Sequence, residues 1–195
     1  ARRTVLELGK LGTEARYHSF PGCEADTLGR FVYALHHGAL GASLPATSLQ
    51  LLHVAAHIDL IERQIRPSLK AGVWVVLDRF WWSTWVYGRV SGCPPKSLMN
   101  ILAVEKYHWG EIRPKVVFLV SRPLVPATGP VMQAYERLAE TERPSQSIVP
   151  LRNASSLDSA VEDVLASVLS TREKAKRRSA ATRLREGRPA RFESS

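Results

Sequence analysis

The chain has 195 residues, of which 45% are hydrophobic and 23% charged, as is typical of one globular domain with some additional chain. Its net charge of +9 is concentrated near the carboxyl end, because residues 171–195 hold nine basic and three acidic side chains. This distribution argues against a nucleic-acid-binding body, and the lack of a long apolar run argues against a transmembrane protein.

Residues 1–12 predict a helix that is already under way where the chain begins, so we expect an element of the fold to precede it. Its apolar face is expected to consist of Val5, Leu6, Leu8 and Leu11. A strand is predicted over 14–20 and a helix over 26–38, with Asp26 or Thr27 as the N-cap of the helix.

The longest helical pattern, residues 45–72, contains Pro67, which should kink or divide the helix near Ile65 or Arg66. It leads into a strand over 73–77, whose continuous β-branched and aliphatic run predicts burial on both faces. Further helices are expected at 93–110, 131–142 and 156–169, and further strands at 115–120 and 146–151.

Strands that alternate with helices through short loops predict an α/β fold, with a parallel sheet covered by helices on both faces. In such sheets, ligands bind at the carboxyl ends of the strands. We expect one domain over residues 1–170, followed by a basic tail, residues 171–195, that is solvated and disordered.

An Asp-Arg pair, Asp78 and Arg79, directly follows the strand at 73–77. Arginine matches the oxygens of a phosphate and stays charged at any relevant pH, while aspartate can orient the guanidinium or hold Mg²⁺ through water. The pair is therefore a candidate phosphate site. The alternative is a strand-end salt bridge that only fixes a loop.

A dense aromatic run follows this pair. It consists of Phe80, Trp81, Trp82, Trp85 and Tyr87. Such rings can stack on a base or wall a pocket while losing little rotamer entropy, although the core is the better interpretation for Trp81 and Trp85. Ser83 and Tyr87 are one helical turn apart, so their polar groups are expected to face the same pocket.

His53 and His57 share one face of the predicted long helix. Two histidines at this spacing can ligate zinc, but the glutamate of the zincin motif and a third ligand are missing. The other interpretations are a pair whose hydrogen bonds are satisfied by protein or solvent, and a pair that faces a ligand. Cys23 and Cys93 lie far apart and outside metal-ligand spacing, so we expect a reducing, cytoplasmic location and no disulfide framework.

A known family pattern lies in residues 48–88, where SLQLLHVAAHIDLIERQIRPSLKAGVWVVLDRFWWSTWVYG resembles the thymidylate kinases, a family of P-loop nucleoside monophosphate kinases. The resemblance is most specific at DRFWWS, where the family has DR[YF]..S. HSFPG at 18–22 is similar to the family's Pro-containing loop beside the substrate phosphate. The family's fold implies a P-loop NTPase-like three-layer α/β/α domain with a parallel sheet, here expected to lack its first central strand.

The resemblance also implies roles for single residues. Arg79 would bind the 5′-phosphate of the substrate, and Asp78 would organise the phosphates and magnesium. His53 stands where the family usually has a base-stacking Phe, and His57 where it has a base-contacting Arg. The substrate-binding residues would be Phe20, Pro21, His53, His57, Arg79, Ser83 and Tyr87.

The residues expected to bind the phosphate donor depart from the family pattern. The loop G-x-x-x-x-G-K-[ST], which cradles the ATP phosphates, does not occur in these residues and is expected upstream of them. The stretch that corresponds to the family's lid is short and leaves only Arg122 and Arg137 as candidates to contact ATP. This chain alone is therefore expected to be inactive.

The leading hypothesis is a dTMP kinase-like phosphotransferase, whose intact form uses ATP and Mg²⁺ to phosphorylate dTMP or a related pyrimidine deoxynucleotide. The alternative is a catalytically inactive relative that binds nucleotides or protein partners. The expected partner is a nucleoside monophosphate, and a homodimer is left open. A membrane or a nucleic acid is not expected.

Overall fold

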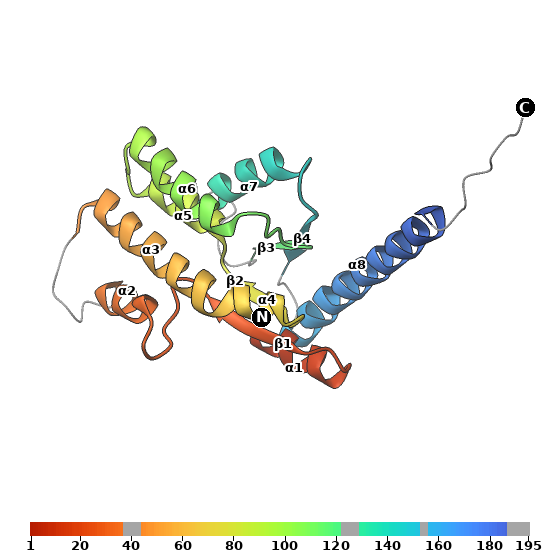
Figure 1. Ribbon diagram of the computed structural model, residues 1–195. Helices are drawn as coiled ribbons and strands as arrows, with labels where there is room; N and C mark the ends of the chain where they lie inside the picture. Colours follow the sequence, from red (N-terminus) through yellow and green to blue (C-terminus); the bar gives the residue numbers. More distant parts are fainter. Residues whose placement is uncertain (37–43, 122–128, 153–155, 187–195) are drawn as a thin grey trace, which may run out of the picture.

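The computed structural model describes residues 1–36, 44–121, 129–152 and 156–186, and Figure 1 shows helices packed around short parallel strands. The strands are β1 (Ala15–Ser19), β2 (Trp74–Asp78), β3 (Val117–Ser121) and β4 (Ile148–Arg152). The helices are α1 (Arg2–Lys10), α2 (Leu28–His36), α3 (Ala46–Leu60), η1 (Ile61–Ile65), α4 (Arg66–Lys70), α5 (Trp81–Val90), α6 (Pro95–Trp109), α7 (Pro130–Glu142) and α8 (Leu157–Glu186). The predicted α/β class, with parallel strands between helices, is confirmed.

The described strands form two separate parallel pairs, β1 with β2 and β3 with β4. The first ladder continues past β1, because the backbone N–H of Phe20 donates to the carbonyl oxygen of Asp78 at 3.0 Å. Within the described residues, β2 and β3 are therefore each paired along one edge only. These are the two strands that the family's fold would place on either side of a central strand.

The apolar strands are less buried than the sequence predicted. The Trp74 to Leu77 side chains of β2 are all only partly buried, and Val120 on β3 is 48% exposed. The sequence pattern is that of a strand covered on both faces, but a strand with a neighbour on one side only remains open along its other edge. The expectation of burial on both faces was therefore wrong for β2.

The main core lies among helices α3, η1, α5, α6 and α7 and is closed by the β2 and β3 side chains. Its most deeply buried apolar residues include Leu60, Ile61, Ile65, Val86 and Leu98. The shared core fixes the position of α3 and α5 relative to the end of β2.

The long helical pattern is divided, as predicted from Pro67. Helix α3 passes into the π-helical segment η1, and α4 then begins at Arg66 with Pro67 in its first turn. Proline is tolerated there because the first N–H groups of a helix have no intrahelical acceptor. The π-helical turn of η1 accommodates the loss of the hydrogen bond that Pro67 cannot donate.

The start of α2 is capped differently from the prediction. The backbone N–H of Leu28 donates to Oδ2 of Asp59 on α3 at 3.2 Å. The Thr27 hydroxyl instead donates to the carbonyl oxygen of Glu24 at 2.8 Å, and Asp26 has a positive φ of 62°. A side chain from another helix thus supplies the acceptor that the sequence pattern assigned to Asp26 or Thr27.

Helices α1 and α8 pack against each other at one end of the molecule (Figure 1), where Arg3 and Asp158 form an ion pair of 2.8 Å. Leu6 and Leu11, which were expected on the apolar face of α1, are 66% and 54% exposed, so that expectation was wrong. Helix α8 continues through Glu186 into the basic segment and projects away from the body. No described helix combines the length and apolarity needed to cross a bilayer.

Candidate functional site

A cavity of about 420 Å³ lies at the carboxyl ends of β1 and β2, with walls from α2, α3 and α5. This volume is within the range of small-molecule sites, and the position is where open α/β sheets bind ligands. The cavity is lined by all seven residues predicted to bind the substrate, Phe20, Pro21, His53, His57, Arg79, Ser83 and Tyr87. The structure thus brings the seven together, and their role in binding stays a prediction.

Arg79 enters the cavity from the turn between β2 and α5. Its backbone is left-handed, with φ of 72°, a conformation that costs a non-glycine residue energy and that clusters at functional sites. Its guanidinium carbon lies 5.1 Å from the centre of the Tyr87 ring, within cation–π distance. No described acidic side chain forms an ion pair with it, so its donors can serve an anion.

Asp78 is exposed at the end of β2 and does not line the cavity. The hydroxyl of Tyr17 donates to its Oδ2 at 3.4 Å, so within the described structure Asp78 bonds to Tyr17 and not to Arg79. The alternative of a strand-end Asp78–Arg79 salt bridge is therefore not the arrangement observed here.

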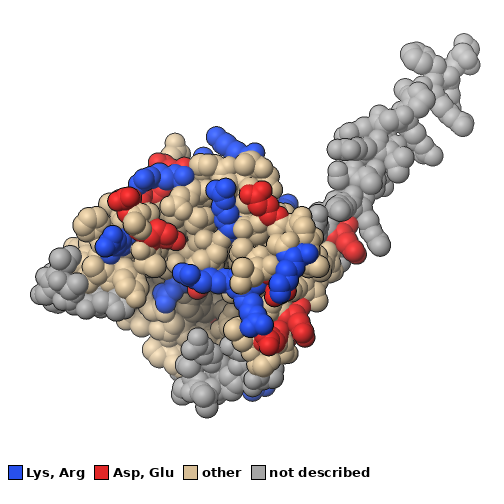
Figure 2. All heavy atoms as spheres, turned by 90° about the horizontal axis from the view of Figure 1, so that it is seen from below, with Lys and Arg blue, Asp and Glu red and all other residues tan. Residues whose placement is uncertain are grey.

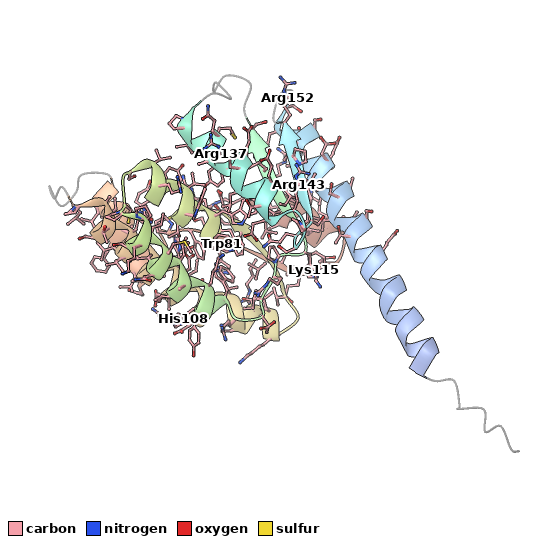
Figure 3. All side chains as sticks on the ribbon, turned by 90° about the horizontal axis from the view of Figure 1, so that it is seen from above. Trp81, His108, Lys115, Arg137, Arg143 and Arg152 are labelled. Atoms are coloured by element: carbon pink, nitrogen blue, oxygen red, sulfur yellow. The ribbon has the colours of Figure 1, made fainter. Side chains whose placement is uncertain are left out.

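Most rings of the aromatic run that follows Arg79 pack in the core and do not line the cavity. Trp81 and Trp82 are 6% and 3% exposed, which confirms the core interpretation of Trp81, and Trp81 lies in the interior of the molecule in Figure 3. Phe80 and Trp85 pack against the same core. Of the five rings, Tyr87 alone is among the described residues that line the cavity, because the face of α5 that carries it is turned away from the core.

The histidine pair lines the cavity from α3, with ring centres 6.1 Å apart. Phe20 stacks on His57 with a centroid distance of 3.9 Å and an interplanar angle of 13°. One face of the His57 ring is therefore covered by protein. His57 is 2% exposed, whereas His53 is only partly buried, so the two rings offer different surfaces to a ligand.

A carboxylate that the sequence analysis missed lies behind this wall. Glu105 on α6 is fully buried, with Oε1 2.9 Å from Nδ1 of His57 and Oε2 accepting a hydrogen bond of 2.7 Å from the Thr84 hydroxyl. Its spacing from Ile101, Leu102 and Trp109 places Glu105 on the apolar face of α6, and this was the available signal. A charged residue on such a face indicates a buried partner.

Two further polar residues of the cavity wall, Gln50 and Thr84, were not identified from the sequence. Gln50 is 4% exposed and follows the helical spacing that brings His53 and His57 to the cavity. Thr84 is 2% exposed and follows Ser83 on α5. Their position next to predicted ligand-facing residues was the signal that could have identified them.

Ser83 is joined to helix α7. Its Oγ lies 2.7 Å from the hydroxyl of Tyr135. Burial raises the pKa of the Tyr135 hydroxyl, although the hydrogen bond to Ser83 acts in the opposite direction. Tyr135 therefore stays a neutral hydroxyl at ordinary pH and holds Ser83 at the cavity wall.

Arg137, one of the two arginines proposed for ATP, does not line this cavity. Arg122 lies outside the described residues, and Arg137 is exposed on α7, on the side of the molecule that also carries Arg152 (Figure 3). The described residues contain no group of three or more His, Cys, Asp or Glu side chains arranged to hold a metal ion. The assignments of Arg122 and Arg137 to ATP and of Asp78 to magnesium stay predictions.

Charged side chains of both signs are spread over the face seen from below in Figure 2, with Lys and Arg gathered at its centre. A mixed face of this kind is typical of a solvated surface and differs from the uniformly basic stripe of a nucleic-acid-binding protein. Within the cavity, Arg79 is the cationic side chain that lines the wall, along with two histidines.

The family model described as "Thymidylate kinase" matches residues 39–149, more than half of the chain. A curated thymidylate kinase from Nitrobacter winogradskyi is 33% identical over 85 residues, which are 44% of this chain and 36% of that protein. Another from Caulobacter vibrioides is 39% identical over 89 residues, 46% of this chain and 41% of that protein. The matched part of the chain thus spans well under half the length of these relatives.

Proposed function

Because this chain belongs to the thymidylate kinase family, we propose that its cavity binds dTMP or a related pyrimidine deoxynucleotide as the acceptor of a phosphoryl group. One observation carries the proposal. The cavity combines a guanidinium from the end of β2 with the buried polar side chains Gln50 and His57 from α3. A nucleoside monophosphate has the matching chemistry, with a dianionic phosphate and a base edge of donors and acceptors.

The phosphate would lie against Arg79. The guanidinium presents planar donors to phosphate oxygens, and this side chain is held over Tyr87 without a carboxylate partner among the described residues. The left-handed backbone at Arg79 turns the chain between β2 and α5, so that the guanidinium reaches the cavity. Energy stored in this conformation is a sign of a position selected for function.

The nucleoside would lie between the β1–α2 loop and the α3 helix. Phe20 and Pro21 supply apolar wall on one side, and His53 supplies a partly exposed ring that can stack on a base. Ser83 and Tyr87 add hydroxyl groups from α5, which suit the sugar. We therefore assign the acceptor nucleotide to this cavity in an extended arrangement from Arg79 toward α3.

The donor in such a reaction is ATP with Mg²⁺, which supplies the transferred phosphoryl group and neutralises its charge. The exposed Asp78 carboxylate suits a magnesium ion that keeps several of its waters. The residues described here do not suit the ATP phosphates, because they hold no G-x-x-x-x-G-K-[ST] loop and Arg137 does not line the cavity. We therefore assign only the acceptor site to this chain.

A second candidate function is that of a nucleotide-binding relative without phosphotransfer activity. The observation that favours it is that Arg137, the described candidate for contact with ATP, does not line the cavity. A coupled kinase assay with dTMP and Mg-ATP separates the two functions. Because this chain alone is expected to be inactive under either function, the informative assay uses the chain with the upstream G-x-x-x-x-G-K-[ST] loop restored. Turnover would then support the kinase, whereas nucleotide binding without turnover would support the binding relative.

The acceptor site is tested by calorimetric titration of the chain with dTMP. Replacement of Arg79 by Ala should weaken binding by about 1.5–3 kcal/mol, since a hydrogen bond to a charged group is lost. Arg89→Ala is the matched control, because Arg89 is an exposed arginine on α5 that lies over Trp85 and does not line the cavity. Equal losses in the two variants would remove Arg79 from the site.

A further inference from the structure

Three buried polar side chains from three helices form one network behind the cavity wall. Glu105 on α6 lies between His57 on α3 and Thr84 on α5, with distances of 2.9 and 2.7 Å. His57 and Thr84 line the cavity, whereas Glu105 does not. Nδ1 of His57 is therefore engaged by Glu105, and Nε2 is the ring nitrogen that remains for a ligand.

The orientation of the His57 ring is fixed by two contacts. Phe20 covers one face at 3.9 Å, and Glu105 holds Nδ1. A ring flip would place a carbon against the fully buried carboxylate and leave Oε1 without its partner, which is costly in the protein interior. What the ring offers to a ligand thus depends on whether Nε2 carries a hydrogen.

The hydrogen-bond partners of Glu105 bear on this. The Thr84 hydroxyl donates to Oε2, so Glu105 acts as an acceptor on that oxygen. An ionised carboxylate accepts on both oxygens, and the hydrogen between His57 and Oε1 then belongs to Nδ1. A neutral imidazole with its hydrogen on Nδ1 has a lone pair on Nε2, as when a buried carboxylate orients a histidine in an active site.

Building on the proposed function, we infer that Glu105 is a positioning residue that makes Nε2 of His57 a hydrogen-bond acceptor and so selects a base with a hydrogen on N3. On thymine or uracil, N3–H is the one donor of the Watson–Crick edge, and it would bond to Nε2. Cytosine in the same position would place the lone pair of N3 against the lone pair of Nε2. The cavity is therefore built for thymine or uracil and against cytosine.

Two measurements on the 195-residue chain test this inference. The first is the ¹⁵N spectrum of histidine-labelled protein at about pH 8, which distinguishes the Nδ1–H tautomer, the Nε2–H tautomer and the imidazolium. The second is calorimetric titration with dUMP and dCMP, which differ only at the base edge, with dTMP as a further ligand. We expect the Nδ1–H tautomer and about tenfold or more tighter binding of dUMP than of dCMP.

Glu105→Gln is the informative variant because it keeps the shape of the side chain. With its oxygen accepting from Thr84, the new amide nitrogen donates to Nδ1 of His57 and moves the imidazole hydrogen to Nε2. The preference for dUMP should then be lost or inverted, together with the change in the ¹⁵N spectrum. Glu62→Gln is the matched control, because Glu62 also contacts a histidine Nδ1, that of His108 at 2.7 Å, but lies outside the cavity.

A second variant tests the inference if Glu105→Gln does not fold. His57→Phe with Glu105→Leu replaces both buried partners by apolar groups, keeps a ring to stack on Phe20, and should bring the dUMP-to-dCMP ratio close to one. It also identifies the His57 signal by its disappearance from the spectrum.

Several results would overturn the inference. These are an Nε2–H tautomer or an imidazolium in the unmodified chain, an unchanged tautomer in Glu105→Gln, or an unchanged dUMP-to-dCMP ratio when the tautomer has switched. Failure of the chain to bind any pyrimidine nucleotide would overturn the proposed function instead, and the base selection with it. Binding of dUMP and dCMP with equal affinity would leave the nucleotide site standing and refute the role of Glu105.

Discussion

The guanidinium of Arg79 lies over the ring of Tyr87, with 5.1 Å between the guanidinium carbon and the ring centre, while the Arg79 backbone is left-handed. Both features place the charged group at the cavity wall immediately after β2. The left-handed conformation is unfavourable for a residue with a Cβ by about 1–2 kcal/mol. Stability and anion binding are therefore expected to oppose each other at this position.

Arg79→Gly should separate the two properties. Both Arg79→Gly and Arg79→Ala lose the guanidinium and should bind dTMP weakly, but glycine adopts a positive φ without steric cost. We expect Arg79→Gly to be more stable than Arg79→Ala by about 1 kcal/mol, as measured by urea denaturation. Equal stability of the two variants would show that the left-handed backbone stores no strain.

Gly29 allows the loop after β1 to approach the start of α2. A Cβ at this position would lie 1.9 Å from the carbonyl oxygen of Pro21, a backbone atom that cannot rotate away. Gly29→Ala should therefore displace the loop that carries Phe20 and Pro21, destabilise the protein by more than about 2 kcal/mol and weaken dTMP binding. Denaturation and calorimetry measure the two effects.

Gly9→Ala is the control for this substitution. Gly9 lies within α1, and a Cβ there would meet nothing within 4 Å. Alanine at this position should stabilise the protein by up to about 1 kcal/mol through its higher helix propensity, with no change in dTMP affinity. A tolerated Gly29→Ala with normal affinity would mean that the loop does not depend on this close approach.

We predict that the buried His18 makes the folded protein less stable in acid. It is 6% exposed on β1, and neither of its ring nitrogens has a hydrogen-bond partner within the described structure. Burial lowers the pKa of His18, with Glu24 acting against this shift and Arg16 reinforcing it. The unfolded chain takes up a proton below about pH 6.5, while the folded protein resists protonation, so stability falls as the pH drops from about 6.5 toward the lower folded pKa.

His18→Phe should remove this dependence, because phenylalanine fills a similar space in the strand and does not titrate. The free energy of unfolding, measured with urea, should increase in the variant by more at about pH 5.5 than at about pH 8. An equal gain at both pH values would indicate that His18 is as readily protonated in the folded protein as in the unfolded chain.

Helices and strands were predictable because apolar spacing and breaker residues act over a few positions. Pro67 divides the long helix for a local reason, and the sequence placed that division correctly. The N-cap of α2 was not predictable in the same way, since Asp59 lies 31 residues from Leu28. Strand burial was overestimated because the apolar pattern of β2 does not reveal how many neighbours the strand has.

The cavity residues were found because they lie at strand ends or on one helix face. The aromatic run was misleading, since ring density alone does not say which face of α5 packs on the core. Glu105 was missed even though its spacing on α6 placed it among apolar residues. Its pairing with His57 and Thr84 depends on how three helices pack, which no local pattern contains.

Helix α8 packs on the body through its first half, and its second half projects from the body (Figure 1). Val161 and Val168 are 6% and 8% exposed, and Asp158 pairs with Arg3. Deletion of residues 175–195 removes none of these contacts and should leave the melting temperature nearly unchanged. Deletion of residues 157–195 removes them all and should lower the melting temperature by several degrees or more, because each buried valine contributes about 1.5–3 kcal/mol. A large drop after the shorter deletion would show that the basic segment itself docks on the body.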